Sequence, residues 1–287
     1  MAIENSFKHS LKRLRWQARR VGTALQWGSG ALASTPVVFG NAMPKSGSHL
    51  INQVLQGLTR IGPFVNPGFP PVNRTEDNQR LPEKEILAGI QSMRPGDIAY
   101  GYILAKEPFL SALSAPGRAT IFVYRDPRDM IISHIFYATE MHDEHWMHQY
   151  YTETLHTMEE RINAAIEGVQ EPGSELTPVR QRYAGYSGWL SQPEVLSMRF
   201  EDLILDRATA FNCLLDYLEQ RGYVPKKDRR ASVETLSQAI IPKKSGTFRK
   251  GKPGNWQDYF TEENKTFFKE KTGDLLIQLG YEKDDNW

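Results

Sequence analysis

The stretch that decides the fold is residues 36–58, which read PVVFGNAMPKSGSHLINQVLQGL. Residues 36–41 are almost wholly apolar, as buried strands of a parallel sheet usually are. Apolar residues then recur with helical spacing over residues 50–58, and Gly62 follows as a stop signal. The loop between them, residues 45–48, would place backbone N–H groups of a helix start against an anion. The stretch therefore predicts a strand, a tight anion-binding loop and a helix.

Strand and helix patterns alternate along the rest of the chain, which predicts an α/β fold: a single domain with a central parallel sheet flanked by helices. Residues 63–82 contain five prolines and predict a long surface loop, a kind of segment that is often functional. We expect this domain over residues 36–287, after a basic helical extension over residues 1–35. Further strands are expected over residues 98–104, 119–124 and 195–200, and further helices over residues 152–165, 208–221 and 262–280.

Composition limits the classes of function. A net charge of +1 argues against a protein that binds polyanions by bulk charge, so we expect no nucleic-acid partner. The single cysteine, Cys213, excludes an intrachain disulfide and is expected to be a small buried residue, which fits the reducing cytoplasm. Residues 21–44 carry no charge, but their glycines, proline and polar residues make a poor membrane span.

The N-terminal extension is strongly basic. Residues 8–20 contain six lysines and arginines, and Glu4 is the only acidic residue near them. Leu11, Leu14 and Trp16 lie among these cations. Such a helix could lie on a membrane surface or act in targeting. A solvated helix packed on the domain is the interpretation we favour.

Two further basic motifs follow the first loop. The predicted strand over residues 119–124 runs into Arg125, and Ser133 lies about two helical turns later. Carboxyl ends of parallel strands form the ligand crevice of an α/β sheet, so both side chains could hold one phosphate. Residues 248–256 form a basic, glycine-containing loop that ends at Trp256. Each motif alone could be an ordinary charged surface, but three in this order indicate a ligand with several anionic groups.

These motifs resemble those of the sulfotransferases that use 3′-phosphoadenosine 5′-phosphosulfate (PAPS). The PKSGS sequence at residues 44–48 is similar to the family's 5′-phosphosulfate loop, and residues 124–133 are similar to its 3′-phosphate motif. Residues 249–256 resemble its C-terminal phosphate-binding loop, and FEDL at residues 200–203 resembles a landmark near the adenine. The resemblance spans about residues 36–280 and implies a P-loop-NTPase-like sulfotransferase fold.

The resemblance also implies an activity and residue roles. It implies transfer of a sulfo group from PAPS to a hydroxyl or amine of a small molecule, which leaves adenosine 3′,5′-bisphosphate (PAP). Lys45 would stabilise the leaving group, and Ser133 would hold or release that lysine. The residues expected to bind the nucleotide are Lys45, Ser46, Gly47, Ser48, His49, Arg125, Ser133, Phe200, Phe248, Arg249, Lys250 and Gly251.

The proton acceptor departs from the family pattern. Cytosolic members carry Lys-Thr-His at the end of the strand before the 3′-phosphate motif, whereas residues 100–102 here read YGY. Tyr102 thus stands in place of the histidine, and a tyrosine of pKa about 10 is a poor base at pH 7 unless that pKa is depressed. Tyr102 could be a tuned base or an orienting donor, or another group, such as His134, His142, Glu107 or a loop carboxylate, could serve instead. Otherwise the chain is a catalytically impaired PAP- or PAPS-binding protein.

Other interpretations are weaker. In a P-loop kinase the lysine follows the glycine, whereas here it precedes it, and no clear Walker-B carboxylate is present. His142, His145 and His148 recur every third residue, a spacing that does not converge on one side of a helix, so we expect no metal. The family's dimer motif is mostly missing over residues 257–265, which leaves the oligomeric state open.

Overall fold

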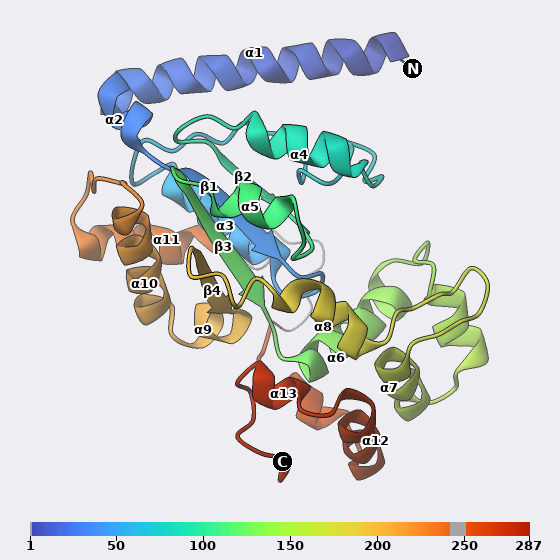
Figure 1. The fold of residues 1–287 in the computed structure, drawn as a ribbon. Helices are drawn as coiled ribbons and strands as arrows, with labels where there is room; N and C mark the ends of the chain where they lie inside the picture. The colour runs from blue at the N-terminus through green and yellow to red at the C-terminus, as the bar shows by residue number, and fades with distance from the viewer. Residues whose placement is uncertain (1, 242–250) are drawn as a thin grey trace. The chain divides into compact units, whose positions relative to one another are not determined.

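A computed structural model describes residues 2–241 and 251–287 of the chain (Figure 1). The described residues group into two compact units, residues 2–124 with 188–241 and residues 125–187 with 251–287, and each is described by itself. The strands, all in the first unit, are β1 (Val37–Ala42), β2 (Ile98–Gly101), β3 (Arg118–Tyr124) and β4 (Val195–Arg199). The helices of the first unit are α1 (Ala2–Trp27), α2 (Ser29–Ser34), α3 (Ser48–Leu58), α4 (Glu83–Gln91), α5 (Phe109–Ser114), α9 (Phe200–Leu205), α10 (Arg207–Gln220) and α11 (Arg229–Ala239).

The sheet is wholly parallel, with the strand order β2-β1-β3-β4. On the central strand β1, Val38 lies opposite Ile98 on one side and Ala119 on the other. All carboxyl ends therefore lie along one edge, where Ala42 of β1 and Tyr124 of β3 are found. The α/β class and the parallel sheet flanked by helices are as the sequence predicted.

The core of the first unit lies where α3 packs on the sheet. Apolar side chains of α3 recur every three or four residues, so Ile51, Val54 and Leu58 share one face and are fully buried. Gly40 of β1 allows this close packing, because a Cβ there would lie 2.9 Å from Ile51 and 3.0 Å from Leu55. The position of α3, and hence of its N-terminus, follows from this contact.

The second unit is helical. Its elements are α6 (Pro127–Phe136), the π-helical turns η1 (Tyr137–Met141) and η2 (Tyr150–Thr154), α7 (Met158–Glu167), α8 (Val179–Ser187), the 3₁₀ turn η4 (Asn255–Asp258), α12 (Glu262–Thr272) and α13 (Leu275–Gln278). The buried guanidinium of Arg128 lies 4.0 Å from the ring of Trp256 and 4.4 Å from that of Trp287. It also pairs with Asp126 at 2.7 Å and Glu282 at 2.6 Å. These contacts fasten the C-terminal segment to α6.

Several predicted boundaries were wrong. The helix expected over residues 152–165 begins only at Met158, because Thr157 and Glu160 form a capping box there. The last helix does begin after Thr261, but it ends at Gly273, whose φ of 56° breaks the helix before α13. Cys213 is exposed, not buried, because its position on α10 faces away from the core.

The N-terminal helix α1 packs on the first unit through one face. Trp16 Nε1 and Arg20 donate hydrogen bonds of 2.9 and 2.7 Å to Asp97, which is fully buried at the start of β2. The backbone N–H of Arg94 donates a third bond, of 2.8 Å, to the same carboxylate. Burial raises the pKa of Asp97, and these donors oppose that rise. In the part of the chain that the structure describes, no helix is both long and apolar enough to cross a membrane.

We expect Asp97→Asn to lower the free energy of unfolding by about 2–4 kcal/mol, because it leaves the mostly buried Arg20 side chain without its counter-charge. Urea unfolding followed by far-UV circular dichroism measures the change. Asp77→Asn, at an exposed position, is the matched control and should stay within about 0.5 kcal/mol. Equal effects of the two substitutions would show that Asp97 does not anchor α1.

Candidate functional site

The loop between β1 and α3 has an unusual backbone. Lys45 has φ 64° and Gly47 has φ 100°, so two of three consecutive residues are left-handed. A non-glycine residue in that region costs free energy, and such residues cluster at functional sites. A Cβ at residue 47 would lie 2.7 Å from the ring of Phe200, so the position requires glycine. The contact also brings Phe200, the first residue of α9, beside the loop.

Ser46 occupies the middle of this loop and is fully buried. Its hydroxyl has no hydrogen-bond partner among the described residues. Buried polar side-chain atoms nearly always have a partner, so this hydroxyl is suited to binding an oxygen of a ligand. No side chain caps α3, so the first N–H groups of the helix are also available to an acceptor. The loop therefore offers a hydroxyl and a helix N-terminus to one anion.

Two basic side chains lie at the loop. His49, the second residue of α3, has a pKa below its usual value because of partial burial and the positive charge of Lys45. A lowered pKa keeps His49 neutral at neutral pH, while Lys45 remains the local cation. The loop thus supplies one full positive charge beside the partial charge of the helix N-terminus.

The segment after β2 is held by two asparagine side chains. Asn73 donates to the backbone C=O of Tyr102 at 3.3 Å and accepts from its N–H at 3.2 Å. Asn41 makes the same pair of bonds to Ile103, at 2.9 and 2.8 Å, and Trp189 Nε1 donates a further bond of 2.8 Å to Ile103 O. These carboxamides continue the hydrogen bonding of the sheet beyond Gly101, and they fix the backbone that carries Tyr102. β2 therefore ends at Gly101, whereas the sequence predicted that this strand would continue to residue 104.

In the second unit, the carboxylate of Asp129 joins two of the predicted motifs. Asp129 pairs with Arg125 at 3.4 Å and accepts the N–H groups of Gly254 and Trp256, each at 2.9 Å. Burial raises the pKa of Asp129, although Arg125 and the two N–H donors oppose the rise. The 3′-phosphate motif and the late glycine loop thus share one buried anion, which orients both.

The helix that follows Arg125 carries Ser133. Asp126 caps α6 by accepting the N–H of Arg128 at 2.9 Å, and Pro127 occupies the first turn. Ser133 lies near the end of α6 and is half-buried. Tyr183 OH donates 2.8 Å to the backbone C=O of Arg125, which fixes the chain just before the helix. Both predicted 3′-phosphate residues therefore belong to one well-bonded unit.

The predicted residues fall on both units. Lys45, Ser46, Gly47, Ser48, His49, Tyr102 and Phe200 lie in the first unit, and Arg125, Ser133 and Gly251 lie in the second. Phe248, Arg249 and Lys250 lie outside the described residues. Sequence reasoning did not single out Asn41, Asn73 or Asp129. Two of these residues could have been found from the sequence. Asn41 is a polar residue at the end of an otherwise apolar predicted strand, and Asp129 is the last residue of the motif that begins at Arg125. Asn73 has no comparable pattern around it.

The alternative proton acceptors have different surroundings. His134 is buried on α6, with its ring 5.2 Å from that of His145, and His142 lies 5.5 Å from the ring of Tyr137, all in the second unit. Glu107 is exposed in the first unit and accepts the N–H of Ser111 at 3.4 Å. Among the residues described, no group of histidine, cysteine, aspartate and glutamate side chains could hold a metal ion.

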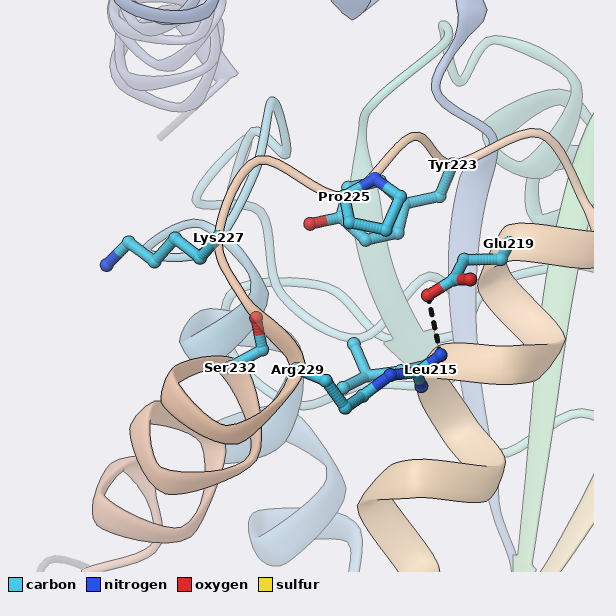
Figure 2. A pocket seen from close by; sticks show the side chains of 7 residues that line it. All are labelled: Leu215, Glu219, Tyr223, Pro225, Lys227, Arg229 and Ser232. Carbon is cyan, nitrogen blue, oxygen red and sulfur yellow. Dashed lines mark hydrogen bonds and ion pairs between the residues drawn. The ribbon is translucent and has the colours of Figure 1, made fainter.

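Figure 2 shows a small cavity elsewhere in the first unit, of about 200 Å³, between α10 and α11. An ion pair of 2.8 Å between Arg229 and Glu219 lies at its wall. None of the predicted site residues lines it. The cavity is lined by Leu215, Glu219, Tyr223, Pro225, Lys227, Arg229 and Ser232.

Comparisons with solved structures agree with this architecture. Mouse sulfotransferase SULT7A1 complexed with PAP has a TM-score of 0.59 and 15% identity, over 87% of this chain and 91% of that one. Retinol dehydratase in complex with androsterone and inactive cofactor PAP has a TM-score of 0.56 and 15% identity, over 85% of this chain and 83% of that one. At this identity the likeness concerns the fold.

Comparisons of sequence give the family. The 3-alpha-hydroxysteroid sulfotransferase of Cavia porcellus is 24% identical over 236 residues, 76% of each chain. The flavonol 3-sulfotransferase of Flaveria bidentis is 25% identical over 169 residues, 50% of each chain. The family model of the sulfotransferase domain matches residues 107–280, which is more than half of the chain. This match shows that the chain belongs to the sulfotransferase family.

Proposed function

We propose that the chain transfers a sulfo group from PAPS to a hydroxyl or amine of a small molecule, with residues 45–48 as the phosphosulfate loop. One observation carries the assignment of the loop. Ser46 has a fully buried hydroxyl without a partner among the described residues, at the N-terminus of α3, which no side chain caps there. That arrangement is suited to an anion bound by a hydroxyl and by backbone N–H groups together.

The loop also suits the chemistry of sulfo transfer. PAPS supplies an activated sulfo group whose leaving group is a nucleotide phosphate. In such a transfer, negative charge grows on the phosphate oxygen, and a fixed cation stabilises it most effectively. Lys45 is that cation, because its backbone is fixed in the left-handed region at the end of β1. Gly47, Ser48 and His49 would offer N–H groups to the same phosphate.

The second unit carries the residues that we assign to the 3′-phosphate. Arg125 and Ser133 would bind it, with Gly251 and the undescribed Phe248, Arg249 and Lys250 from the late loop. Asp129 acts as a positioning residue, because it orients both Arg125 and the N–H groups after Gly251.

Tyr102 is our candidate for the group that orients or accepts the acceptor's proton. Its backbone is bound on both sides by Asn73, so the residue is pre-organised at the carboxyl edge of the sheet. Glu107, the other candidate in the first unit, is exposed and makes one long hydrogen bond to a helix N-terminus. The geometry therefore favours Tyr102 over Glu107.

The acceptor is proposed from the chemistry of related proteins. The curated relatives are named for sulfation of a hydroxysteroid and a flavonol, so a hydroxyl acceptor is favoured over an amine. A catalytically impaired PAP-binding protein is the second candidate, because tyrosine replaces the expected histidine. We place the activity in the cytoplasm, in agreement with the single, exposed cysteine.

We predict that Ser46→Ala weakens binding of both PAP and adenosine 5′-phosphate by about 10–100-fold, because a hydrogen bond to a charged group contributes about 1.5–3 kcal/mol. The melting temperature should not fall, since the substitution removes an unpartnered buried hydroxyl. Ser114→Ala is the matched control, because its buried hydroxyl also lacks a partner among the described residues. Calorimetric titration and a thermal melt measure both effects. Unchanged affinity in Ser46→Ala would contradict a role of this loop in nucleotide binding.

Arg125→Gln should weaken PAP binding by about 10–100-fold but leave adenosine 5′-phosphate binding within about twofold, because only PAP carries a 3′-phosphate. Asp129→Asn should reduce the preference for PAP over adenosine 5′-phosphate to a smaller extent. Glu171→Gln, which changes an exposed acid in the same unit, is the control and should retain the preference. Competition titrations of the two nucleotides give the ratio. An equal loss for both nucleotides in Arg125→Gln would contradict a 3′-phosphate role.

Tyr102→Phe should lower kcat for sulfo transfer by about 10²–10⁴-fold, the usual contribution of a positioned acid or base, with PAP affinity unchanged. Transfer of labelled sulfate to a panel of phenols and alcohols measures the rate. A Tyr102→Phe rate equal to that of the unmodified chain would transfer the role to another group. No transfer by the unmodified chain, with activity gained in Tyr102→His, would establish the impaired protein instead.

A further inference from the structure

We propose that the outer face of α1 docks on an anionic membrane surface. Two observations support this proposal: an exposed apolar stripe on the helix, and the flanking Arg13 and Arg15, which form no ion pair with the described carboxylates. The proposal does not depend on the assignment of the sulfotransferase site, because it concerns a different surface of the first unit (Figure 1).

The apolar stripe follows the helix axis. Its members recur at alternating intervals of three and four residues, so their side chains share one face. Single exposed apolar residues are ordinary, but a row along one helix marks an interaction surface. The exposed fractions of its large members are 38% for Leu11, 62% for Leu14, 60% for Val21 and 83% for Leu25, and Ala18 completes the stripe.

The opposite face fixes α1 to its own unit. Trp16 and Arg20 lie two residues after Leu14 and Ala18, about half a turn around the helix. Both bind Asp97, and Arg94 stacks over the Trp16 ring at 4.9 Å. Because α1 is held by this face, its apolar stripe is turned away from the unit. Docking therefore requires no rearrangement of the helix.

The charges beside the stripe select the partner. Arg13 and Arg15 immediately flank Leu14 in the sequence, so they project on either side of the stripe. Both are exposed, and neither forms an ion pair in the described part of the chain. Glu4 is the only acidic residue in α1. An apolar stripe between unpaired cations complements acyl chains beneath anionic headgroups.

A second copy of the chain is a poorer occupant. Parallel pairing of two α1 helices through the stripe would bring Arg13 and Arg15 close to the same cations of the other copy. Such like-charge contacts oppose association, whereas anionic lipid neutralises them. Each cation near an anionic surface changes membrane affinity by about fivefold at moderate salt. The helix is not apolar enough to span a bilayer, so its position would be along the surface.

The test is co-sedimentation of the full chain with vesicles of phosphatidylcholine alone and of phosphatidylcholine with one quarter phosphatidylglycerol. We expect binding to the anionic vesicles only, and at least tenfold weaker binding at 0.5 M than at 0.1 M salt. Leu14→Asp with Leu25→Asp should abolish it, and Arg13→Gln with Arg15→Gln should weaken it by about tenfold or more.

Matched controls separate the stripe from general effects. Leu205→Asp alters a leucine that is 73% exposed outside α1, and Lys226→Gln with Lys227→Gln removes two exposed cations of the same unit. Both controls should bind like the unmodified chain, and PAP affinity should be unchanged in every variant. No sedimentation with anionic vesicles, or equal loss in the controls, would overturn the proposal. A dimer in light scattering that Leu14→Asp dissociates would identify a second copy as the occupant instead.

Discussion

The left-handed backbone at Lys45 and Gly47 is the constraint on which the first unit's site depends. It turns the chain from β1 into α3 within a few residues, so that the helix starts at the carboxyl edge of the sheet. The turn is possible because Gly40 lets α3 pack closely on β1, and Phe200 closes over Gly47 from the other side. An anion-suited loop is thus a consequence of how the strand and the helix pack.

The second unit fixes the residues that we propose bind phosphate in a different way from the first. Its organising group is a buried carboxylate, Asp129, rather than a strained turn. A buried charge is tolerated only with good partners, and here these are a guanidinium and two backbone N–H groups. Because the partners come from two distant segments, Asp129 makes the geometry of one depend on the other. The aromatic rings around Arg128 strengthen the same junction.

The sequence predicted most of the fold, because apolar periodicity and glycine stops are local signals. Strands β1, β3 and β4 and helices α3 and α10 came out close to their predicted limits. The errors lay where side-chain hydrogen bonds override periodicity: the capping box at Thr157, and the end of β2, where asparagines replace strand partners. Short motifs pointed to the residues that we propose bind the nucleotide. Asn73 could not be found this way, since a carboxamide in a proline-rich loop has no pattern until the chain folds back on itself.

The asparagine clamps have a consequence for how this site can evolve. Asn73 and Asn41 grip only the backbone of Tyr102 and Ile103, so the strand end keeps its shape whatever side chain stands at position 102. The scaffold is thereby separated from the side chain that we propose as the reactive group, and that side chain can be exchanged without loss of these hydrogen bonds. A change between histidine and tyrosine at position 102 would therefore alter the side-chain chemistry and keep the backbone contacts.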